Sequence, residues 1–458
     1  MPIAPRRSGF LLKLLKLITV VNPHEVQKAL LLAFNIFLIL AAYYMLKVVR
    51  DATVLEDYGA NTKNLMSGIQ VILLILVVKA FSTLASRVNR EKLVSRVTMF
   101  FIVNLGVIYI LFVTGALGRA MSIVYFIWVG IFNVMVIAQF WGFTIDLYSE
   151  EDGKRLFPII MFGSNFGGLA GALASKLLVD PKTINPMVVY QLIVIAGVML
   201  GFCIFLMKYI HRREIKKSFQ DSFQKEKESY VEETEQEKPL EKEGGFRLVF
   251  RSPYLLYIAI FVLLLNLINT TGEWILDSVF ELTSDNAVQT GEIVAESTLA
   301  YIANLKANFF ITVNALALLI QVVIVSRLFK WFGVRAAVFV LPFIAFGGNI
   351  AMSLSASLVV VTWAKALENS TDYSLTNTTR HALFLITTRE EKYKAKAAID
   401  AFFHRAGDIG STMLVGIAAG IYALSIESVA KINIAVAIVW ILLCFLIAKE
   451  HKKLKKRI

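Results

Sequence analysis

The chain has 458 residues, of which 57% are hydrophobic and 18% charged, and apolar runs of about 20 residues recur along its whole length. A soluble protein of this length would carry more charge and shorter apolar stretches, whereas these runs are long enough to cross a hydrocarbon core of about 30 Å. A backbone in lipid must satisfy its own hydrogen bonds, and the period-2 pattern of a strand barrel is absent, so the sequence predicts an all-α polytopic membrane protein.

The formal net charge of +13 would also suit a nucleic-acid-binding protein. The lysines and arginines concentrate instead in alternate loops, as the positive-inside rule predicts for a membrane protein. Cys203 and Cys444 both lie inside apolar runs and have no metal-ligand neighbour. We therefore expect no nucleic-acid partner, no cofactor and no metal.

The predicted organisation begins with a basic N-terminal segment, 1–29, in which FLLKLLKLI is too short to span a membrane and suits an amphipathic helix at its surface. Two six-helix halves follow, at 30–210 and 251–448. They are joined by a charged cytoplasmic linker, 211–250, and a basic tail occupies 449–458. About twelve spans are expected, at 30–52, 64–86, 94–116, 122–145, 156–178, 187–210, 252–275, 306–328, 334–354, 358–385, 396–424 and 428–448.

The basic residues of the loops assign the two sides of the membrane. One side receives Arg6, Arg7, Lys13, Lys16, Arg87, Arg90, Lys92, Arg96, Lys154, Arg155, Arg327, Lys330, Arg335 and the basic residues of 389–396 and 449–458. The other side has few, namely Lys63, Arg119, Lys182 and Lys306. This distribution predicts a multi-pass protein of the inner membrane with both termini cytoplasmic.

An internal repeat supports two halves. SRVNR at 86–90 matches SRLFK at 326–330, and EEDGK at 150–154 matches EEKYK at 390–394, both at an offset of 240 that also aligns Gly167 with Gly407. Because both matches lie on one predicted side, the halves share an orientation, as in the major facilitator architecture, where substrate binds near the middle of the membrane. An unrelated twelve-helix bundle is the alternative.

The tenth predicted span carries the clearest set of intramembrane charges. Its polar residues are Lys365, Glu368, Asp372, Thr376 and Arg380, spaced three or four apart and so on one helical face. Such a face cannot meet lipid, which makes it a candidate lining for a water-filled path. The alternative is an internal ladder of ion pairs that only holds the bundle together. Arg380 has no acidic neighbour at helical spacing on its C-terminal side.

The first predicted span ends in a similar group. Tyr43, Lys47 and Arg50 share a face, and Asp51 follows directly. These cations fall toward the outer half, where the charge rule disfavours them, so they are candidate substrate ligands; snorkelling to headgroups is the alternative. Lys79 in the second span lies deeper and needs a partner, for which Asp51 is a candidate.

Further polar residues lie in the seventh, fourth and eleventh spans. Glu273 falls near the end of the seventh span, while Asp277 and Glu281 after it are expected to be solvated. Gln139 and Asp146 lie in or next to the fourth span, the latter near the cytoplasmic mouth. The eleventh span carries a candidate gate network, composed of Asp400, His404, Arg405 and Asp408.

The small-residue stretch GSNFGGLAGALAS at 163–175 resembles a phosphate-binding loop only superficially. It lacks the Gly-Lys-Ser/Thr ending, and Gly167, Gly171 and Ser175 at every fourth position favour close helix packing. Its polar residue Asn165 is a candidate substrate ligand. The chain has no Walker A motif, which argues against a primary pump, and no nucleophile–base spacing that suggests an enzyme.

Four segments resemble a known family: KVVRDATVL, FWGFTIDLYSEEDGKRLFPIIMFGSNFGGLAGALAS, NLINTTGEWIL and DYSLTNTTRHALFLITTREEKYKAKAAIDAFFHRAGDIG. They look like the ATP/ADP translocase family, the nucleotide exchangers of obligate intracellular bacteria and plastids and a distant branch of the major facilitator fold. By this resemblance, Arg50 and Arg380 stand where family members have lysines linked to transport. The family's acid in the seventh helix does not align with Glu273.

Residues and resemblance together predict a secondary transporter that exchanges nucleotides or a related phosphorylated anion by alternating access. The expected substrate ligands are Lys47, Arg50, Lys79, Arg380, Tyr43, Gln139, Asn165, Glu273 and Asp372. The expected gating or ion-pair residues are Asp51, Asp146, Lys365, Glu368, Asp400, His404, Arg405 and Asp408. The expected partners are membrane lipid and the small anionic substrate, with the protein monomeric. The alternatives are a transporter of another organic anion, coupled to protons, and a non-transporting membrane scaffold or sensor.

Overall fold

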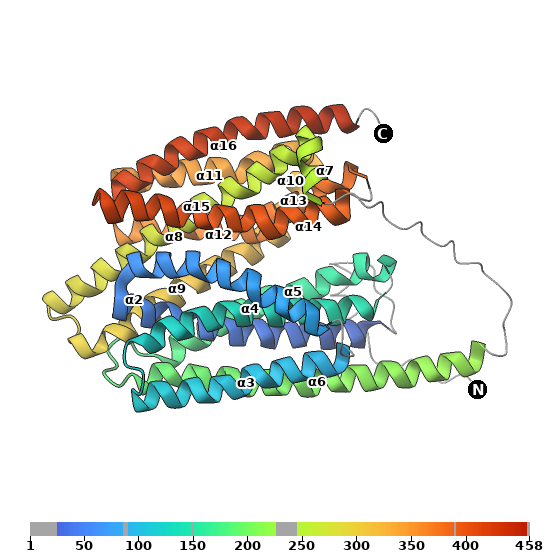
Figure 1. Ribbon diagram of the computed structural model, residues 1–458, viewed down its shortest axis with the longest axis horizontal. Coiled ribbons are helices and arrows are strands. Elements are labelled where there is room, and N and C mark those ends of the chain that lie inside the picture. The colour runs from blue at the N-terminus through green and yellow to red at the C-terminus, as the bar shows by residue number, and fades with distance from the viewer. Residues whose placement is uncertain (1–24, 86–89, 149, 226–244, 389–390, 456–458) are drawn as a thin grey trace. The chain divides into compact units, whose positions relative to one another are not determined.

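The computed structural model describes residues 25–455 apart from 86–89, 149, 226–244 and 389–390 (Figure 1). The predicted amphipathic N-terminal helix and residues 226–244 of the charged linker therefore lie outside the described residues. Within the described ranges every regular element is a helix and none is a strand. This confirms the all-α class expected from the apolar runs.

The chain forms two units. The first contains the described residues of Met1–Arg50, Leu76–Leu178 and Met187–Glu237. The second contains those of Asp51–Ile75, Val179–Pro186 and Lys238–Ile458. Two short pieces of the predicted N-terminal half, 51–75 and 179–186, thus pack with the unit that holds the C-terminal helices.

The first unit is built from long helices. They are both ends of α2 (Val26–Ala85), α3 (Arg90–Thr114), α4 (Ala120–Asp146), α5 (Glu150–Leu178) and α6 (Met187–Lys225). α3 packs against α4 and α6. A small apolar cluster of Ala29, Ala33, Leu156 and Ile159 joins the beginning of α2 to α5.

Close packing of α2 and α5 depends on the glycines of the small-residue stretch. A Cβ atom at Gly163, Gly167 or Gly171 would collide with the carbonyl oxygen of Ala33, Phe37 or Ala41, respectively. Glycine at every fourth position therefore lets the two backbones approach, as small residues do in membrane helix pairs. The interpretation of this stretch as a packing motif is confirmed.

The second unit contains more and shorter helices. The α-helices are α7 (Gly245–Arg251), α8 (Pro253–Gln289), α9 (Thr298–Leu319), α10 (Ser326–Trp331), α11 (Gly333–Leu354), α12 (Leu358–Thr371), α13 (Asn377–Leu383), α14 (Lys396–Ala398), α15 (His404–Val415) and α16 (Ile426–Lys455). The other helical turns are η1 (Ala295–Ser297), η2 (Ile320–Val325), η3 (Asp372–Thr376), η4 (Phe384–Ile386), η5 (Glu391–Ala395), η6 (Ile399–Phe403) and η7 (Gly416–Ile421).

The core of the second unit lies where α8, α11 and α16 meet (Figure 1). Trp440 of α16 is buried against Phe261 of α8, with ring centroids 5.2 Å apart. The thiol of Cys444 lies 3.5 Å from the carbonyl oxygen of Val338 in α11. This core packs around α8, which carries several of the polar residues discussed below.

Eight helices in the described part of the chain are long and apolar enough to cross a membrane. α5, α12–α13 and α14–α15, which overlap three predicted spans, are not among them, so the count of twelve stays a prediction. α6 continues to Lys225 and α16 to Lys455, so the beginning of the linker and most of the tail are helical. α8 continues to Gln289, well past the predicted end of the seventh span.

Candidate substrate and gating residues

Lys365 and Glu368 form a buried ion pair on α12. The Lys365 side chain is inaccessible to solvent, and its Nζ lies 2.7 Å from Glu368 Oε1. The same Nζ donates to the backbone oxygen and to Oδ1 of Asn269 on α8, each at 3.1 Å. A Cβ atom at Gly272 would lie 2.9 Å from Lys365 Nζ, so this glycine makes room for the lysine. The pair joins α12 to α8, as the ladder alternative proposed.

The face predicted for the tenth span does not continue as a straight stripe. Residues Asp372–Thr376 form a π-helical turn, η3, between α12 and α13. A π turn contains an extra residue, so positions after it are rotated relative to those before it, and such turns are frequent at functional sites. Thr376 is buried, whereas Asp372 and Arg380 are partly exposed. The assumption of uniform α-helical spacing from Lys365 to Arg380 was therefore wrong.

Arg380 has an acidic partner that helical spacing could not reveal. Its Nη2 lies 2.5 Å from Asp400 Oδ1, and Lys396 Nζ lies 2.7 Å from Asp400 Oδ2. The carboxylate comes from η6, twenty residues further along the chain. The expectation that Arg380 lacks an acidic neighbour held only within its own helix, because an interhelical partner supplies the charge.

The remaining residues of the predicted gate network collect around Asp408. Its Oδ1 accepts a hydrogen bond from Thr270 Oγ1 of α8 at 2.9 Å, and its Oδ2 lies 3.3 Å from Arg405 Nη1. Its Oδ2 lies 3.8 Å from His404 Nδ1. The predicted single network is thus two clusters, because Asp400 pairs with Arg380 and Lys396 instead.

Asp277 binds two buried lysines, and the expectation that it is solvated was wrong. Only 3% of its surface is exposed. Lys63 Nζ lies 2.6 Å from its Oδ2, and Lys306 Nζ binds its Oδ1. Asp51 adds a second carboxylate, 3.6 Å from Lys63 Nζ. We call Asp51, Lys63, Asp277 and Lys306 the buried quartet; it joins segment 51–75 to α8 and α9.

The quartet lies next to the break in α2. Gly59 is the one non-helical residue of α2, with φ of 73°, a conformation that glycine adopts without strain. The backbone N–H of Ala60 donates to Glu281 Oε2 at 2.9 Å, so a carboxylate of α8 caps the helix that restarts there. Trp274 Nε1 donates to Asn61 Oδ1 at 2.9 Å. Glu281, like Asp277, therefore binds segment 51–75, although it was expected to be solvated.

In the first unit the predicted cations of α2 lie against aromatic rings. The Arg50 guanidinium lies 4.8 Å from the centre of the Phe126 ring on α4, and Lys47 Nζ lies 5.8 Å from that of Tyr44. Lys47 is buried, and Tyr43 and Arg50 are partly exposed. Cation–π contacts of this kind stabilise a buried or half-buried positive charge. Asp51, which follows Arg50 directly, pairs with Lys63 and belongs to the second unit.

Gln139 on α4 is buried, with 7% of its surface exposed, and neither its amide nitrogen nor its amide oxygen has a hydrogen-bond partner. Buried amides are nearly always hydrogen-bonded, so this side chain calls for a partner that the structure lacks. Asn165 of α5 and Glu273 of α8 are partly exposed. The side chains of Lys79 and Asp146 lie outside the described residues.

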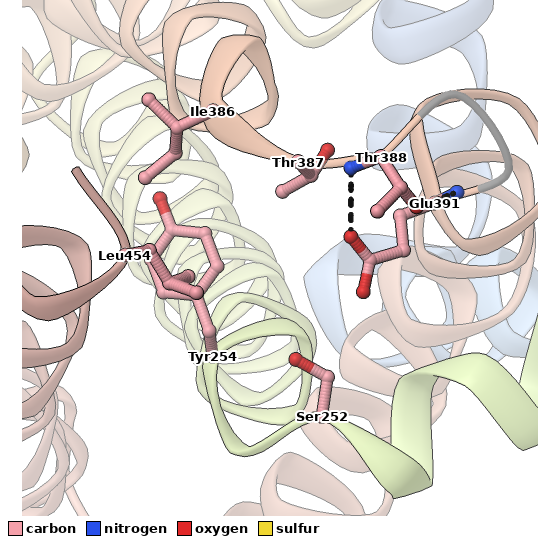
Figure 2. Close-up of a pocket in the computed structure, with 7 residues that line it drawn as sticks. All are labelled: Ser252, Tyr254, Ile386, Thr387, Thr388, Glu391 and Leu454. Atoms are coloured by element: carbon pink, nitrogen blue, oxygen red, sulfur yellow. Dashed lines mark hydrogen bonds between the residues drawn. The ribbon is translucent and has the colours of Figure 1, made fainter. Parts of the chain in front are cut away.

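A cavity of about 400 Å³ opens in the second unit beside the start of α8 (Figure 2). It is lined by Ser252, Tyr254, Ile386, Thr387, Thr388, Glu391 and Leu454. Figure 2 shows Thr388 N donating to Glu391 Oε2, at 2.9 Å, and Glu391 N lies 3.3 Å from Thr388 Oγ1, so the two residues cap the next helical turn reciprocally. No predicted substrate ligand lines this cavity.

The helical fold is similar to that of solved membrane transporters. A solved bacterial homologue of the human lysosomal transporter Spinster, inward-facing and unoccupied, matches with a TM-score of 0.59 and 13% identity, covering 95% of this chain and 99% of its own. A structure of the nucleoside transporter NupG matches with a TM-score of 0.55 and 9% identity, covering 93% of this chain and 99% of its own. These likenesses concern the fold alone.

The chain belongs to the TLC ATP/ADP transporter family, whose model matches residues 117–457. ADP,ATP carrier protein 1 of Chlamydia pneumoniae is 23% identical over 317 residues, which is 62% of this chain and 57% of the relative. ADP,ATP carrier protein 2 of the same organism is 23% identical over 350 residues, 70% of this chain and 64% of the relative. The matched region thus spans less than two thirds of each relative's length.

Proposed function

We propose that this protein is a membrane antiporter that exchanges nucleotides of the ATP/ADP type. The observation that carries the proposal is the family match, which extends over 117–457 and includes the tenth predicted span. The buried cations of the structure agree with nucleotide exchange, because ionisable groups at membrane depth mark substrate pathways. The family resemblance of KVVRDATVL at the end of the first span, outside the matched residues, agrees with this assignment.

Phosphate groups in a site of low dielectric need charge-assisted hydrogen bonds. In the first unit, Lys47 and Arg50 supply two cations on the same helical face of α2, and Arg offers the bidentate geometry that phosphate oxygens accept. Tyr43 and the unpartnered amide of Gln139 supply neutral donors and acceptors, which suit the base or ribose of a nucleotide. In the second unit, Arg380 supplies a further cation on α13.

Exchange of ATP against ADP would move one net negative charge in each cycle. A membrane potential of 100 mV contributes about 2.3 kcal/mol for each charge moved. The potential would therefore bias the direction of exchange. We further propose that the protein is a monomer of the bacterial inner membrane, with twelve spans and both termini in the cytoplasm, as the loop charges predict.

The test is uptake of labelled ATP by proteoliposomes that contain the purified protein. We expect uptake when the vesicles contain ADP and at most a small fraction of it when they are empty. Arg50→Ala should abolish uptake, whereas Arg212→Ala, at an exposed position of α6, should leave it unchanged. Uptake that needs no internal nucleotide would contradict exchange, and normal uptake by Arg50→Ala would contradict the role of this cation.

A transporter of another organic anion, coupled to protons, is the second candidate. It is favoured by the acidic groups of α12 and η3, since Glu368 is 4% exposed and Asp372 follows it by one turn. Carboxylates in such positions form proton relays in other transporters. Proton flux reported by a pH-sensitive dye, in the absence of any nucleotide, would favour this candidate over nucleotide exchange.

A further inference from the structure

The buried quartet combines two cations and two anions with almost no access to water. The exposed fractions are 2% for Asp51, 5% for Lys63 and 3% each for Asp277 and Lys306. Asp277 is the shared acceptor, because each of its carboxylate oxygens binds one lysine. Lys306 also lies 5.1 Å from the centre of the Phe280 ring. If the Asp277 carboxylate leaves, two buried lysines remain with Asp51 as the second acid of the quartet.

The two acids lie at the same distance along the chain from the residue that contacts an aligned glycine. Gly167 in the first unit packs on the carbonyl of Phe37, and Gly407, which the repeat aligns with it, packs in the second unit on the carbonyl of Leu263. Asp51 lies 14 residues after Phe37, and Asp277 lies 14 residues after Leu263. The two acids therefore lie equally far from corresponding glycine contacts, and Asp277 binds both lysines.

Segment 51–75 is bound to α8 and α15 on both sides of Lys63. Ala60 N and Asn61 Oδ1 bind Glu281 and Trp274 of α8. Farther along, the hydroxyl of Thr412 in α15 donates to the carbonyl oxygen of Asn64 at 3.2 Å. These contacts form one patch, at an end that the loop charges assign to the outside. In an alternating-access cycle a patch of this kind has to separate, and the quartet is its charged part.

We propose that Lys63 and Lys306 form an anion site for substrate phosphate, which the Asp277 carboxylate fills in the state seen here. The inference rests on the proposed nucleotide exchange, and it adds a phosphate site that the sequence did not indicate. A carboxylate and a phosphate both offer two oxygens to two ammonium groups. The phosphate takes the place of Asp277 between Lys63 and Lys306, which breaks the ion pairs that join α8 to segment 51–75, so binding of the anion favours their separation. Only ion pairs are exchanged, with no covalent step.

Competition between the Asp277 carboxylate and phosphate for the two lysines predicts a measurable change in anion affinity. An internal occupant lowers the apparent affinity of a ligand by the fraction of time that the site is free. Removing the charge of Asp277 should therefore strengthen anion binding, and a site that is free one tenth of the time would gain about tenfold. A role limited to holding the helices together predicts the opposite, namely a less stable protein with unchanged anion binding.

The experiment measures how inorganic pyrophosphate raises the melting temperature of the purified full-length protein in detergent. Asp277→Asn should lower the half-saturating pyrophosphate concentration about tenfold, while Asp277→Glu, which keeps a carboxylate, should behave like the wild type. Adding Lys306→Met to Asp277→Asn should remove the gain. Asp285→Asn is the matched control, because Asp285 is exposed on the same helix.

The inference is overturned if Asp277→Asn binds pyrophosphate like the wild type, or if its gain survives Lys306→Met. It also fails if Asp285→Asn gives the same gain, since the effect would then come from net charge. Failure of the proposed function looks different: the wild type would not exchange ADP for ATP in vesicles, although the pyrophosphate series behaves as expected. If the wild type exchanges nucleotides but Asp277→Asn does not bind pyrophosphate more tightly, the phosphate site is wrong and the proposed exchange function still stands.

Discussion

Lys365 and Glu368 neutralise each other inside the second unit, with 2.7 Å between Nζ and Oε1 and side-chain exposures of 0% and 6%. Both come from one turn of α12, and Asn269 of α8 completes the coordination of the lysine. A buried pair with this geometry behaves as a single neutral unit. Its contribution to stability therefore depends on whether one partner is removed or both are.

Lys365→Met should destabilise the protein by about 3–5 kcal/mol, because it leaves Glu368 buried without its cation. The double variant Lys365→Met/Glu368→Gln should recover most of this loss, since no buried charge remains. Thermal unfolding of the variants in detergent measures both effects. A single variant as stable as the wild type, or a double variant no better than the single one, would contradict the neutral-pair interpretation.

Arg380 and Asp400 offer a charge-reversal test of gating. Arg380→Asp and Asp400→Arg should each reduce nucleotide exchange strongly, because each places like charges together. The double reversal restores an ion pair between positions 380 and 400, while Lys396 then lies four residues from the new arginine. Because Arg380 is also a proposed phosphate ligand, we expect the double variant to regain the melting temperature of the wild type but not its exchange rate in proteoliposomes. A double variant that regains most of the exchange rate would contradict the role of Arg380 as a phosphate ligand and leave it only as the ion-pair partner of Asp400.

The helical class and most helices could be predicted from the sequence, because apolar runs of membrane length leave few alternatives. The partners of the charged residues could not, since side-chain spacing reports only neighbours on one helix. Arg380 meets Asp400 across two helical segments, and the π turn at Asp372–Thr376 rotates the predicted face. The pattern of apolar residues does not predict a π turn.

The buried quartet was missed for a related reason. Lys63, Asp277 and Lys306 all lie near predicted span ends, where charges are normally solvated. One signal was available: the predicted outer side has few basic residues, and Lys63 and Lys306 are two of them. Charges that remain where the positive-inside rule disfavours them call for a search for acidic partners. Here α8 supplies the shared acid because it continues as a helix to Gln289.

The glycines of α5 allow a stability prediction with a control in the same unit. Gly167→Ala should destabilise the protein by about 1–3 kcal/mol, because the new methyl group meets the carbonyl of Phe37. Gly201→Ala on α6 has nothing within 4 Å of its new methyl group and should be neutral or slightly stabilising. Melting temperatures compare the two variants, and an equal effect of both would refute close α2–α5 packing.

A variant of Gln139 tests substrate binding and protein stability separately. Both atoms of its amide group are buried without partners, so Gln139→Leu should leave the melting temperature unchanged or raise it. If the amide binds the nucleotide, the same variant should raise KM for ATP about tenfold, since a lost hydrogen bond of about 1.4 kcal/mol corresponds to that factor. The measurements are thermal unfolding and concentration-dependent uptake. A fall in stability with unchanged KM would mean that Gln139 is a structural residue whose partner forms in the other conformation.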